Sequence, residues 1–139
     1  MHEIVRHAAE ARRNAYAPYS GYAVGACVLG ANGKLYRGCN VENASFGLTV
    51  CAERSAVVQM VADGCKELLE VAVVTRDGAT PCGMCLQTLA EFAIELNHVT
   101  VHCASAEGTV TTYQLHELLP HGFALGEFHD NAEETGESE

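Results

Sequence analysis

Residues 68–104 read LLEVAVVTRDGATPCGMCLQTLAEFAIELNHVTVHCA, and this stretch decides the fold class. It begins with LLEVAVVT (68–75), a nearly continuous apolar run typical of a strand that is buried on both faces. CGMCLQTLAEFAIEL (82–96) has the spacing of a helix, and VTVHCA (99–104) is another short apolar strand. Strands that alternate with helices predict a sheet with helices packed on its faces.

The residues before this stretch extend the pattern. Residues 4–14 have the periodicity of a short amphipathic helix. YAVGACVLG (22–30) and GKLYRGCNV (33–41) are strand-like, and the Asn32-Gly33 pair between them favours a tight hairpin turn. CAERSAVVQMVADG (51–64) predicts a helix that starts at or near Cys51 and stops at Gly64. The order of elements predicts an α/β fold, a three-layered α/β/α sandwich.

The end of the chain differs in composition. Residues 109–113 are compatible with a last strand and residues 114–119 with a short helix. Residues 126–139 contain six acidic residues, no Lys or Arg and few apolar groups, which indicates a frayed, disordered tail. Because 139 residues make one ordinary domain, we expect a single domain over residues 1–125.

Charge and hydropathy exclude some classes of partner. The net charge is -10, and all eight Lys and Arg lie at or before Arg76. Nucleic-acid binding usually requires a clustered positive surface, so a nucleic-acid partner is not expected. The chain has no apolar run of about 18 residues, and its first 16 residues carry too many charges for a signal peptide. We expect a cytoplasmic protein with no membrane partner.

Two predicted helix starts carry cysteines. One is Cys51-Ala52-Glu53 and the other is Pro81-Cys82-Gly83-Met84-Cys85, where Pro81 is expected to start the helix. A helix N-terminus stabilises the thiolate form of cysteine, which is the form that binds metals. If the two helices lie side by side, three thiolates converge, which is the ligand count of a catalytic zinc site with one position left for water. Glu53 would lie near that water.

Two further kinds of site are compatible with these cysteines. Cys82 and Cys85 could form a redox-active dithiol. They could also belong to a structural four-cysteine zinc site, together with Cys51 and a fourth cysteine. The candidates for that fourth ligand lie in or beside apolar segments, where cysteine usually acts as a small buried hydrophobic residue: Cys27, Cys39, Cys65 and Cys103.

The combination of C-A-E and P-C-x-x-C resembles the signature of the zinc nucleoside deaminases in its three-cysteine form. The chain is similar in particular to the short homotetrameric cytidine deaminases. The similarity extends over ordered blocks from ARRNAYAPYS (11–20) through GCNVENASFGLTVCAER (38–54) to ELLPHGF (117–123). This resemblance implies a sandwich with a central mixed β-sheet and a homotetramer with shared active sites.

The resemblance also implies the roles of individual residues. One Zn²⁺ per subunit would be bound by Cys51, Cys82 and Cys85. Glu53 would carry the proton while an activated water attacks the amino-bearing carbon of the pyrimidine and ammonia is released. The implied substrate contacts are the side chains of Asn40 and Glu42 on the ribose hydroxyls, the ring of Tyr22 and the backbone of Ala52 at the base, and Phe123 from a neighbouring subunit.

Two positions depart from the common family pattern. Leu86 replaces the Arg of P-C-x-x-C-R, and Phe46 replaces a Tyr that usually offers a hydroxyl to the 5' end of the sugar. Three thiolates and one Zn²⁺ sum to a net charge of -1, which an Arg near the thiolates would offset. Without it, we expect Arg54 and the helix N-termini to supply the compensation.

The implied function is zinc-dependent hydrolytic deamination of free cytidine and 2'-deoxycytidine in pyrimidine salvage. An alternative is a deaminase of a modified cytosine nucleoside, N4-substituted or blasticidin-like. A deaminase of RNA or DNA would use the same chemistry but would need to hold a polyanion. A non-catalytic zinc-stabilised interaction module would need a fourth protein ligand and would have no use for Glu53.

Overall fold

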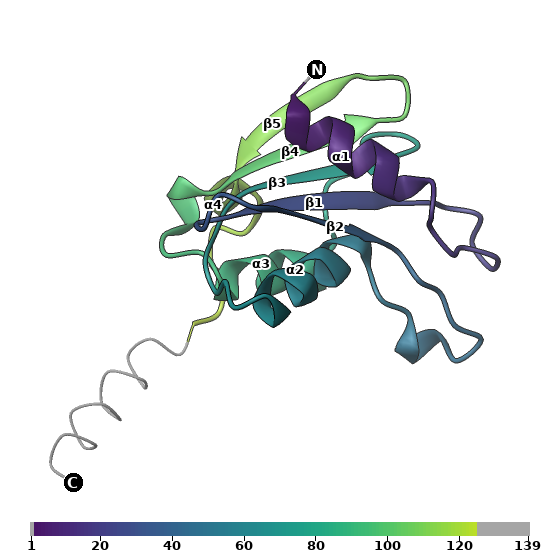
Figure 1. Cartoon of the computed structure of the whole chain (residues 1–139), viewed down its shortest axis with the longest axis horizontal. Coiled ribbons are helices and arrows are strands. Elements are labelled where there is room, and N and C mark those ends of the chain that lie inside the picture. The colour runs from purple at the N-terminus through teal and green to yellow at the C-terminus, as the bar shows by residue number, and fades with distance from the viewer. Residues whose placement is uncertain (1, 125–139) are drawn as a thin grey trace, which may run out of the picture.

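The computed structural model describes residues 2–124, which form a five-stranded sheet covered by helices on both faces (Figure 1). The strand order is β2-β1-β3-β4-β5. β3 and β4 run parallel, and the other neighbouring strands are antiparallel. The strands are β1 (Gly25–Gly30), β2 (Leu35–Cys39), β3 (Leu68–Thr75), β4 (Thr100–Ser105) and β5 (Val110–Gln114). The sheet is therefore mixed, as predicted.

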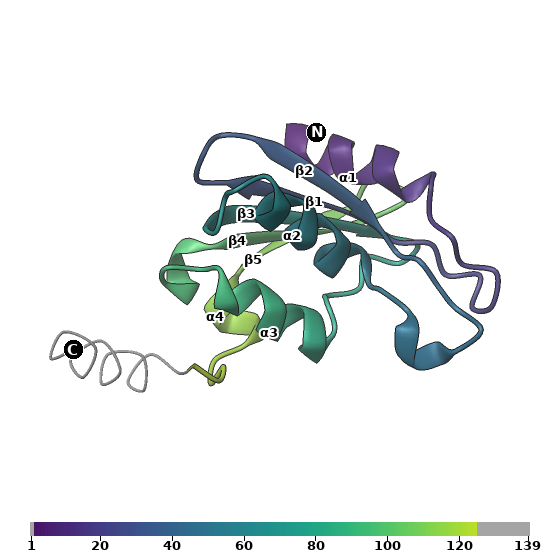
Figure 2. The ribbon, with the colours of Figure 1, turned by 60° about the horizontal axis from the view of Figure 1, so that its bottom comes forward.

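The helices form the two outer layers of the sandwich. α1 lies on one face of the sheet, and α2 and α3 lie on the other (Figures 1 and 2). The helical elements are α1 (Glu3–Arg12), α2 (Ala52–Ala62), α3 (Gly83–Glu91) and α4 (Leu115–Leu118), with 3-10 turns η1 (Phe46–Leu48) and η2 (Leu96–His98). Within residues 2–124, no helix is long and apolar enough to cross a membrane. The predicted three-layered α/β/α sandwich is confirmed.

The central place of β3 in the sheet explains why residues 71–74 are all apolar. Val71 and Val73 belong to the core between the sheet and the helices α2 and α3. Ala72 and Val74 belong to the second core, between the sheet and α1. Because successive side chains of a strand point to opposite faces, a strand with helices on both sides needs apolar residues at every position.

Several boundaries differ from the predicted ones, and tertiary hydrogen bonds account for two of them. β1 begins at Gly25 rather than at Tyr22, since the Val24 amide donates to the side chain of Asn40 (2.9 Å). α3 ends at Glu91 rather than at Leu96, and the Phe92 carbonyl accepts from the Leu68 amide (3.0 Å). α1 ends at Arg12, before the predicted Asn14. The expected tail, residues 126–139, lies outside the described residues.

Gly38 allows α2 to pack closely on β2. A Cβ atom at this position would lie 2.4 Å from the Ala52 carbonyl oxygen and 2.5 Å from the Ala56 amide nitrogen. These are backbone atoms of the helix that begins beside Cys51, so a side chain here would displace the helix.

We expect Gly38→Ala to lower the free energy of unfolding by about 1–3 kcal/mol, the usual cost of overpacking a core. Urea denaturation at one fixed protein concentration measures this change. Gly47→Ala is the matched control, because a Cβ there meets no atom within 4 Å. Equal stability of Gly38→Ala and the parent protein would contradict the role assigned to this contact.

Candidate active site

The cysteines at the two helix starts lie at the positions where side chains are free to bind a ligand. Cys51 is the N-cap residue of α2 and Cys82 the N-cap residue of α3, and neither side chain caps its helix. Cys85 lies in the first turn of α3. Pro81 was expected to start α3, but the helix begins at Gly83, so Pro81 precedes the N-cap instead. It fixes the backbone that leads into Cys82.

The three sulfur atoms form a compact cluster. All three Sγ atoms lie within 4.8 Å of one another, and those of Cys82 and Cys85 are 3.4 Å apart. Tetrahedral Zn²⁺ with Zn–S bonds of about 2.3 Å requires sulfur atoms about 3.8 Å apart, so the cluster fits one zinc ion. Among residues 2–124, no fourth Cys, His, Asp or Glu joins this cluster. The arrangement thus favours a three-ligand zinc site over a closed four-cysteine site.

The thiols are arranged so that negative charge is stabilised at one of them. A hydrogen bond from the Cys85 thiol lowers the pKa of Cys51 to about 5, and Arg54 contributes in the same direction. The same hydrogen bond raises the pKa of Cys85, and burial adds to this effect. A cation bound between the sulfurs favours the thiolate form at all three positions.

Glu53 is a buried carboxyl group beside the cluster. It lies in the first turn of α2 and is only 4% exposed. Burial raises the pKa of Glu53 to about 7, and the nearby charge of Cys51 adds to this effect. A carboxyl group with a pKa near neutrality can both accept and donate a proton, which is the property required of a general acid and base.

A cleft of about 300 Å³ opens onto the cysteines and Glu53. This volume lies at the lower end of the range for small-molecule sites. Eight of the residues predicted for the site line it: Tyr22, Asn40, Glu42, Cys51, Ala52, Glu53, Cys82 and Cys85. Residues far apart in the sequence are therefore gathered around one space that ends at the sulfur cluster.

Asn40 and Glu42 are held in place by the loop between α1 and β1. The side-chain amide of Asn40 donates to the Tyr22 carbonyl (2.8 Å), and its oxygen accepts from the Val24 amide. Glu42 accepts from the amides of Tyr19 (2.9 Å) and Ser20 (3.1 Å) and from the Ser20 hydroxyl. The hydroxyl of Ser20 is the main reason why the pKa of Glu42 is lowered. The structure thus fixes both side chains at the wall of the cleft.

Arg54 lies behind the cluster. Its Nη2 atom donates to the Thr49 carbonyl (2.9 Å), and its charge lowers the pKa of Cys51. Its Nε atom is buried and has no hydrogen-bond partner among the described residues. The guanidinium group is therefore close enough to act on the thiolate charge without lining the cleft.

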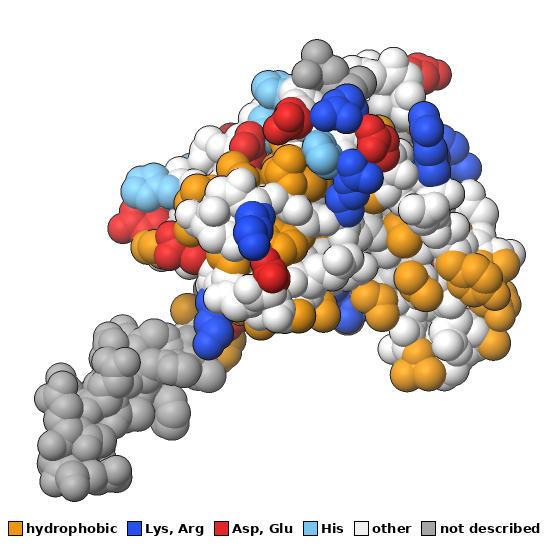
Figure 3. Space-filling model, viewed as in Figure 1, with side chains coloured by type: hydrophobic (Ala, Val, Ile, Leu, Met, Phe, Trp, Pro, Cys, Tyr) orange, Lys and Arg blue, Asp and Glu red, His pale blue; other side chains and the backbone are white. Residues whose placement is uncertain are grey.

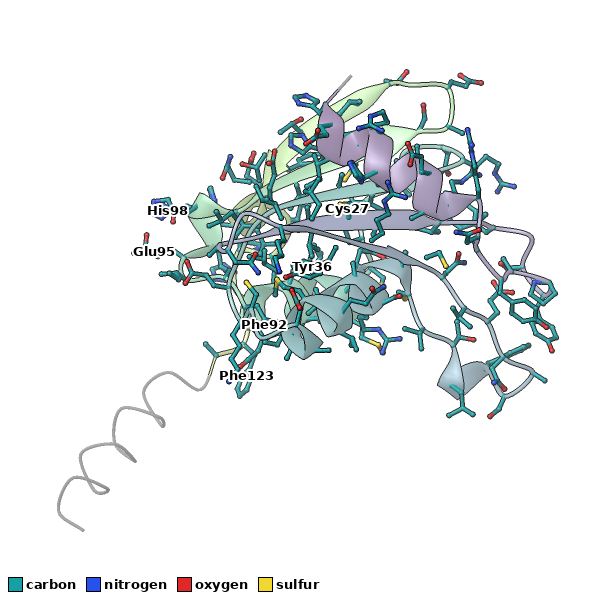
Figure 4. All side chains as sticks on the ribbon, in the orientation of Figure 1. Cys27, Tyr36, Phe92, Glu95, His98 and Phe123 are labelled. Atoms are coloured by element: carbon teal, nitrogen blue, oxygen red, sulfur yellow. The ribbon has the colours of Figure 1, made fainter. Side chains whose placement is uncertain are left out.

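Two predicted substrate contacts lie outside the cleft of their own chain. Phe46 is 75% exposed and packs edge-on against Tyr19, with ring centroids 6.1 Å apart. Phe123 is 69% exposed and lies near the end of the described chain (Figure 4), where its backbone bonds to the side chain of Gln87. A contact of Phe123 with substrate would require a cleft on another subunit.

Several cleft residues were not singled out from the sequence. Ser20, Thr49 and Thr75 each line the cleft, and Thr75 lies at the carboxyl end of β3. Ligands of open α/β sheets bind beyond the carboxyl ends of the strands, so the last residue of LLEVAVVT was the available signal. Ser20 and Thr49 have no comparable signal, since isolated hydroxyl residues are common in loops.

Comparison with known proteins agrees with this geometry. The family described as the cytidine and deoxycytidylate deaminase zinc-binding region matches residues 1–103. A cytidine deaminase of Halalkalibacterium halodurans is 37% identical over 129 residues, which cover 91% of this chain and 96% of that protein. A cytidine deaminase of Mycobacterium tuberculosis is 39% identical over 124 residues, 86% of each chain.

Solved structures give the same result. The crystal structure of cytidine deaminase from Burkholderia pseudomallei superimposes with a TM-score of 0.81 at 37% identity and covers 88% of this chain and 100% of that one. That of cytidine deaminase from Mycobacterium tuberculosis has a TM-score of 0.75 at 37% identity, with 88% and 95% covered. With its three-cysteine cluster, the chain belongs to the zinc-binding cytidine and deoxycytidylate deaminase family.

Proposed function

We propose that this protein hydrolyses free cytidine and 2'-deoxycytidine to uridine and 2'-deoxyuridine with release of ammonia, as an enzyme of pyrimidine salvage. The observation that carries the proposal is the position of Glu53, a buried carboxyl group that shares one small-molecule cleft with three convergent thiols. A module that only used zinc for stability would not require such a carboxyl group beside its ligands.

In the proposed reaction, water adds to the amino-bearing carbon of the pyrimidine, and the amino group leaves as ammonia. Zn²⁺ held by Cys51, Cys82 and Cys85 would activate the water at neutral pH. A carboxylate oxygen of Glu53 accepts one proton of the water and delivers it to the ring nitrogen of the base beside the attacked carbon. It then takes the remaining proton of the added hydroxyl and passes it to the departing amino group, so that the residue ends the cycle in its starting state. The raised pKa of Glu53, about 7, suits both steps.

The remaining cleft residues are proposed to bind and orient the nucleoside. Asn40 and Glu42 are assigned to the ribose hydroxyls, because an amide and a carboxylate together offer a donor and acceptors. The ring of Tyr22 is assigned to the base, and the backbone of Ala52 to its polar edge. All four residues line the cleft, which supports these assignments.

We further propose a homotetramer in which Phe123 of one subunit closes the cleft of another. The described surface supports assembly, because Val41, Phe46 and Leu48 are exposed and hydrophobic side chains gather over the projecting loop that carries η1 (Figures 1 and 3). Contiguous exposed apolar groups commonly mark an interface between proteins.

We further propose that the protein acts in the cytoplasm and that residues 1–125 form its catalytic domain. The three ligand thiols must stay reduced to bind zinc, and the cytoplasm maintains that state. Every residue assigned to the site lies between Tyr22 and Phe123, within the proposed catalytic domain of residues 1–125.

A deaminase of a modified cytosine nucleoside remains the second candidate, because Phe46 has no hydroxyl to offer to an ordinary 5' end.

The proposed activity predicts ammonia release from cytidine and 2'-deoxycytidine by the zinc-loaded protein, and none from a single-stranded oligonucleotide. Glu53→Gln should retain zinc and lower kcat at least about a hundredfold, since it removes the proton carrier and keeps the shape of the side chain. Ammonia release and zinc content are the two measurements. A parent protein that binds zinc but is inactive on both nucleosides would refute the proposal.

Arg54 is expected to be the main cation that offsets the net charge of the zinc site. We predict that Arg54→Ala lowers kcat at least about tenfold, near 1.4 kcal/mol of activation free energy. Steady-state kinetics at matched zinc content measures the effect. Arg37→Ala is the control for loss of one positive charge, because Arg37 pairs with Glu10 and does not line the cleft. Parent-like turnover of Arg54→Ala would eliminate this role.

Because Phe46 has no hydroxyl group, we predict weak recognition of the 5' hydroxyl group of the nucleoside. We expect 5'-deoxycytidine to keep kcat/KM within about twofold of cytidine, since Phe46 cannot make the neutral hydrogen bond of about 0.5–1.5 kcal/mol that a Tyr hydroxyl would contribute. 3'-Deoxycytidine is the matched comparison and should lose more, because Glu42 is assigned to the ribose hydroxyls. A loss of about tenfold or more with the 5'-deoxy compound would be incompatible with this hypothesis.

A further inference from the structure

Two loops meet at the open side of the cleft, and one hydrogen bond joins their side chains. The first loop connects α1 to β1 (residues 13–24), and the second connects β3 to α3 (residues 76–82). The hydroxyl of Tyr22 donates to Oδ1 of Asp77 at 2.6 Å. Of these two residues, only Tyr22 lines the cleft. Asp77 therefore acts on the site only through its neighbours.

Asp77 is itself anchored to the end of the central strand. The hydroxyl of Thr75 donates to Asp77 Oδ1 (3.3 Å). The oxygen of the same Thr75 hydroxyl accepts from the amides of Gly78 (2.8 Å) and Ala79 (3.0 Å). Thr75 is 3% exposed, so this turn is built on a buried group. Gly78 has a φ of +79°, a backbone conformation that glycine adopts readily. The carboxylate is thus presented by an ordered turn rather than by a free loop.

Both the side chain and the backbone of Tyr22 are held in place. The guanidinium carbon of Arg76 lies 5.1 Å from the ring centroid, within the range of a cation–π contact. The Tyr22 amide donates to the Ser20 hydroxyl (3.0 Å), and its carbonyl accepts from Asn40. The bond to Asp77 fixes the far end of the side chain, so the ring is ordered before any ligand arrives.

We propose that Asp77 is a positioning residue of this site, which holds Tyr22 and the loop leading to Cys82 in the conformation that accepts the pyrimidine base. The inference rests on the proposed function for the identity of the base. A side chain ordered in advance loses less conformational entropy when the ligand binds, so the bond strengthens binding without taking part in the chemistry. Deleting it should therefore change KM much more than kcat.

The pair can be tested by a double-mutant cycle in the full-length, zinc-loaded protein. Tyr22→Phe removes only the hydroxyl, and Asp77→Ala removes its acceptor. We expect each variant to raise KM for cytidine about three- to tenfold, with kcat within about twofold and one zinc per chain. The double variant should be no worse than the more affected single variant, because both delete the same interaction.

The matched control is a second tyrosine–aspartate pair that lies away from the cleft. The Tyr36 hydroxyl donates to the carboxylate of Asp63, and neither residue lines the cleft. Tyr36→Phe should lower stability and leave KM unchanged. An equal rise of KM in Tyr36→Phe would show general loosening of the fold and overturn the proposal. A parent-like KM in Tyr22→Phe or in Asp77→Ala would also overturn it, as would effects of the two changes that multiply in the double variant.

A ligand-free measurement separates this proposal from the proposed function. Amide hydrogen exchange at Gly78 and Ala79 should be faster in Tyr22→Phe than in the parent and unchanged in Tyr36→Phe. If the parent protein does not deaminate cytidine, the function fails while this measurement still decides whether the bond orders the loop. Identical exchange in Tyr22→Phe and the parent overturns the positioning role whatever the substrate.

Discussion

The convergence of two helix N-termini on one point is the constraint on which the rest of this structure depends. Three sulfur atoms within 4.8 Å require that α2 and α3 start side by side. Both helices lie on the same face of the sheet, and the crossover from β3 through α3 to the parallel strand β4 places the start of α3 at the carboxyl end of β3. The close packing of α2 on Gly38 then sets the position of Cys51 relative to Cys82.

The sequence predicts the elements of this fold better than their ends. Periodicity identifies the buried strand β3 and its flanking helices because burial on one or two faces leaves a regular apolar pattern. The ends of β1 and α3 depend on partners from distant segments, such as the side chain of Asn40 at Val24 and the amide of Leu68 at Phe92. Such bonds form only in the assembled fold, and no local pattern encodes them.

The same distinction applies to the site. The convergence of Cys51, Cys82 and Cys85 beside Glu53 could be predicted because helix starts and short spacings place these residues locally, and the deaminase signature names them together. The turn of Thr75 and Asp77 could not be predicted, since its importance comes from a tyrosine more than fifty positions earlier in the chain. Phe46 and Phe123 are exposed in the isolated chain, so the substrate contacts expected of them stay predictions.

Leu86 bears on how the net negative charge of a three-thiolate zinc site is offset. By its resemblance to the family pattern P-C-x-x-C-R, the sequence has Leu86 where an Arg is expected. In the structure its side chain is 7% exposed and belongs to the core between the sheet and the helices α2 and α3. An arginine in that environment would need partners to offset the loss of hydration of its charge, whereas leucine needs only contact with its apolar neighbours. Leu86 therefore contributes to the core and brings no charge to the thiolates, which leaves the helix N-termini and Arg54 as the groups expected to offset their charge. The side chain of Arg54 bonds to the loop before Cys51.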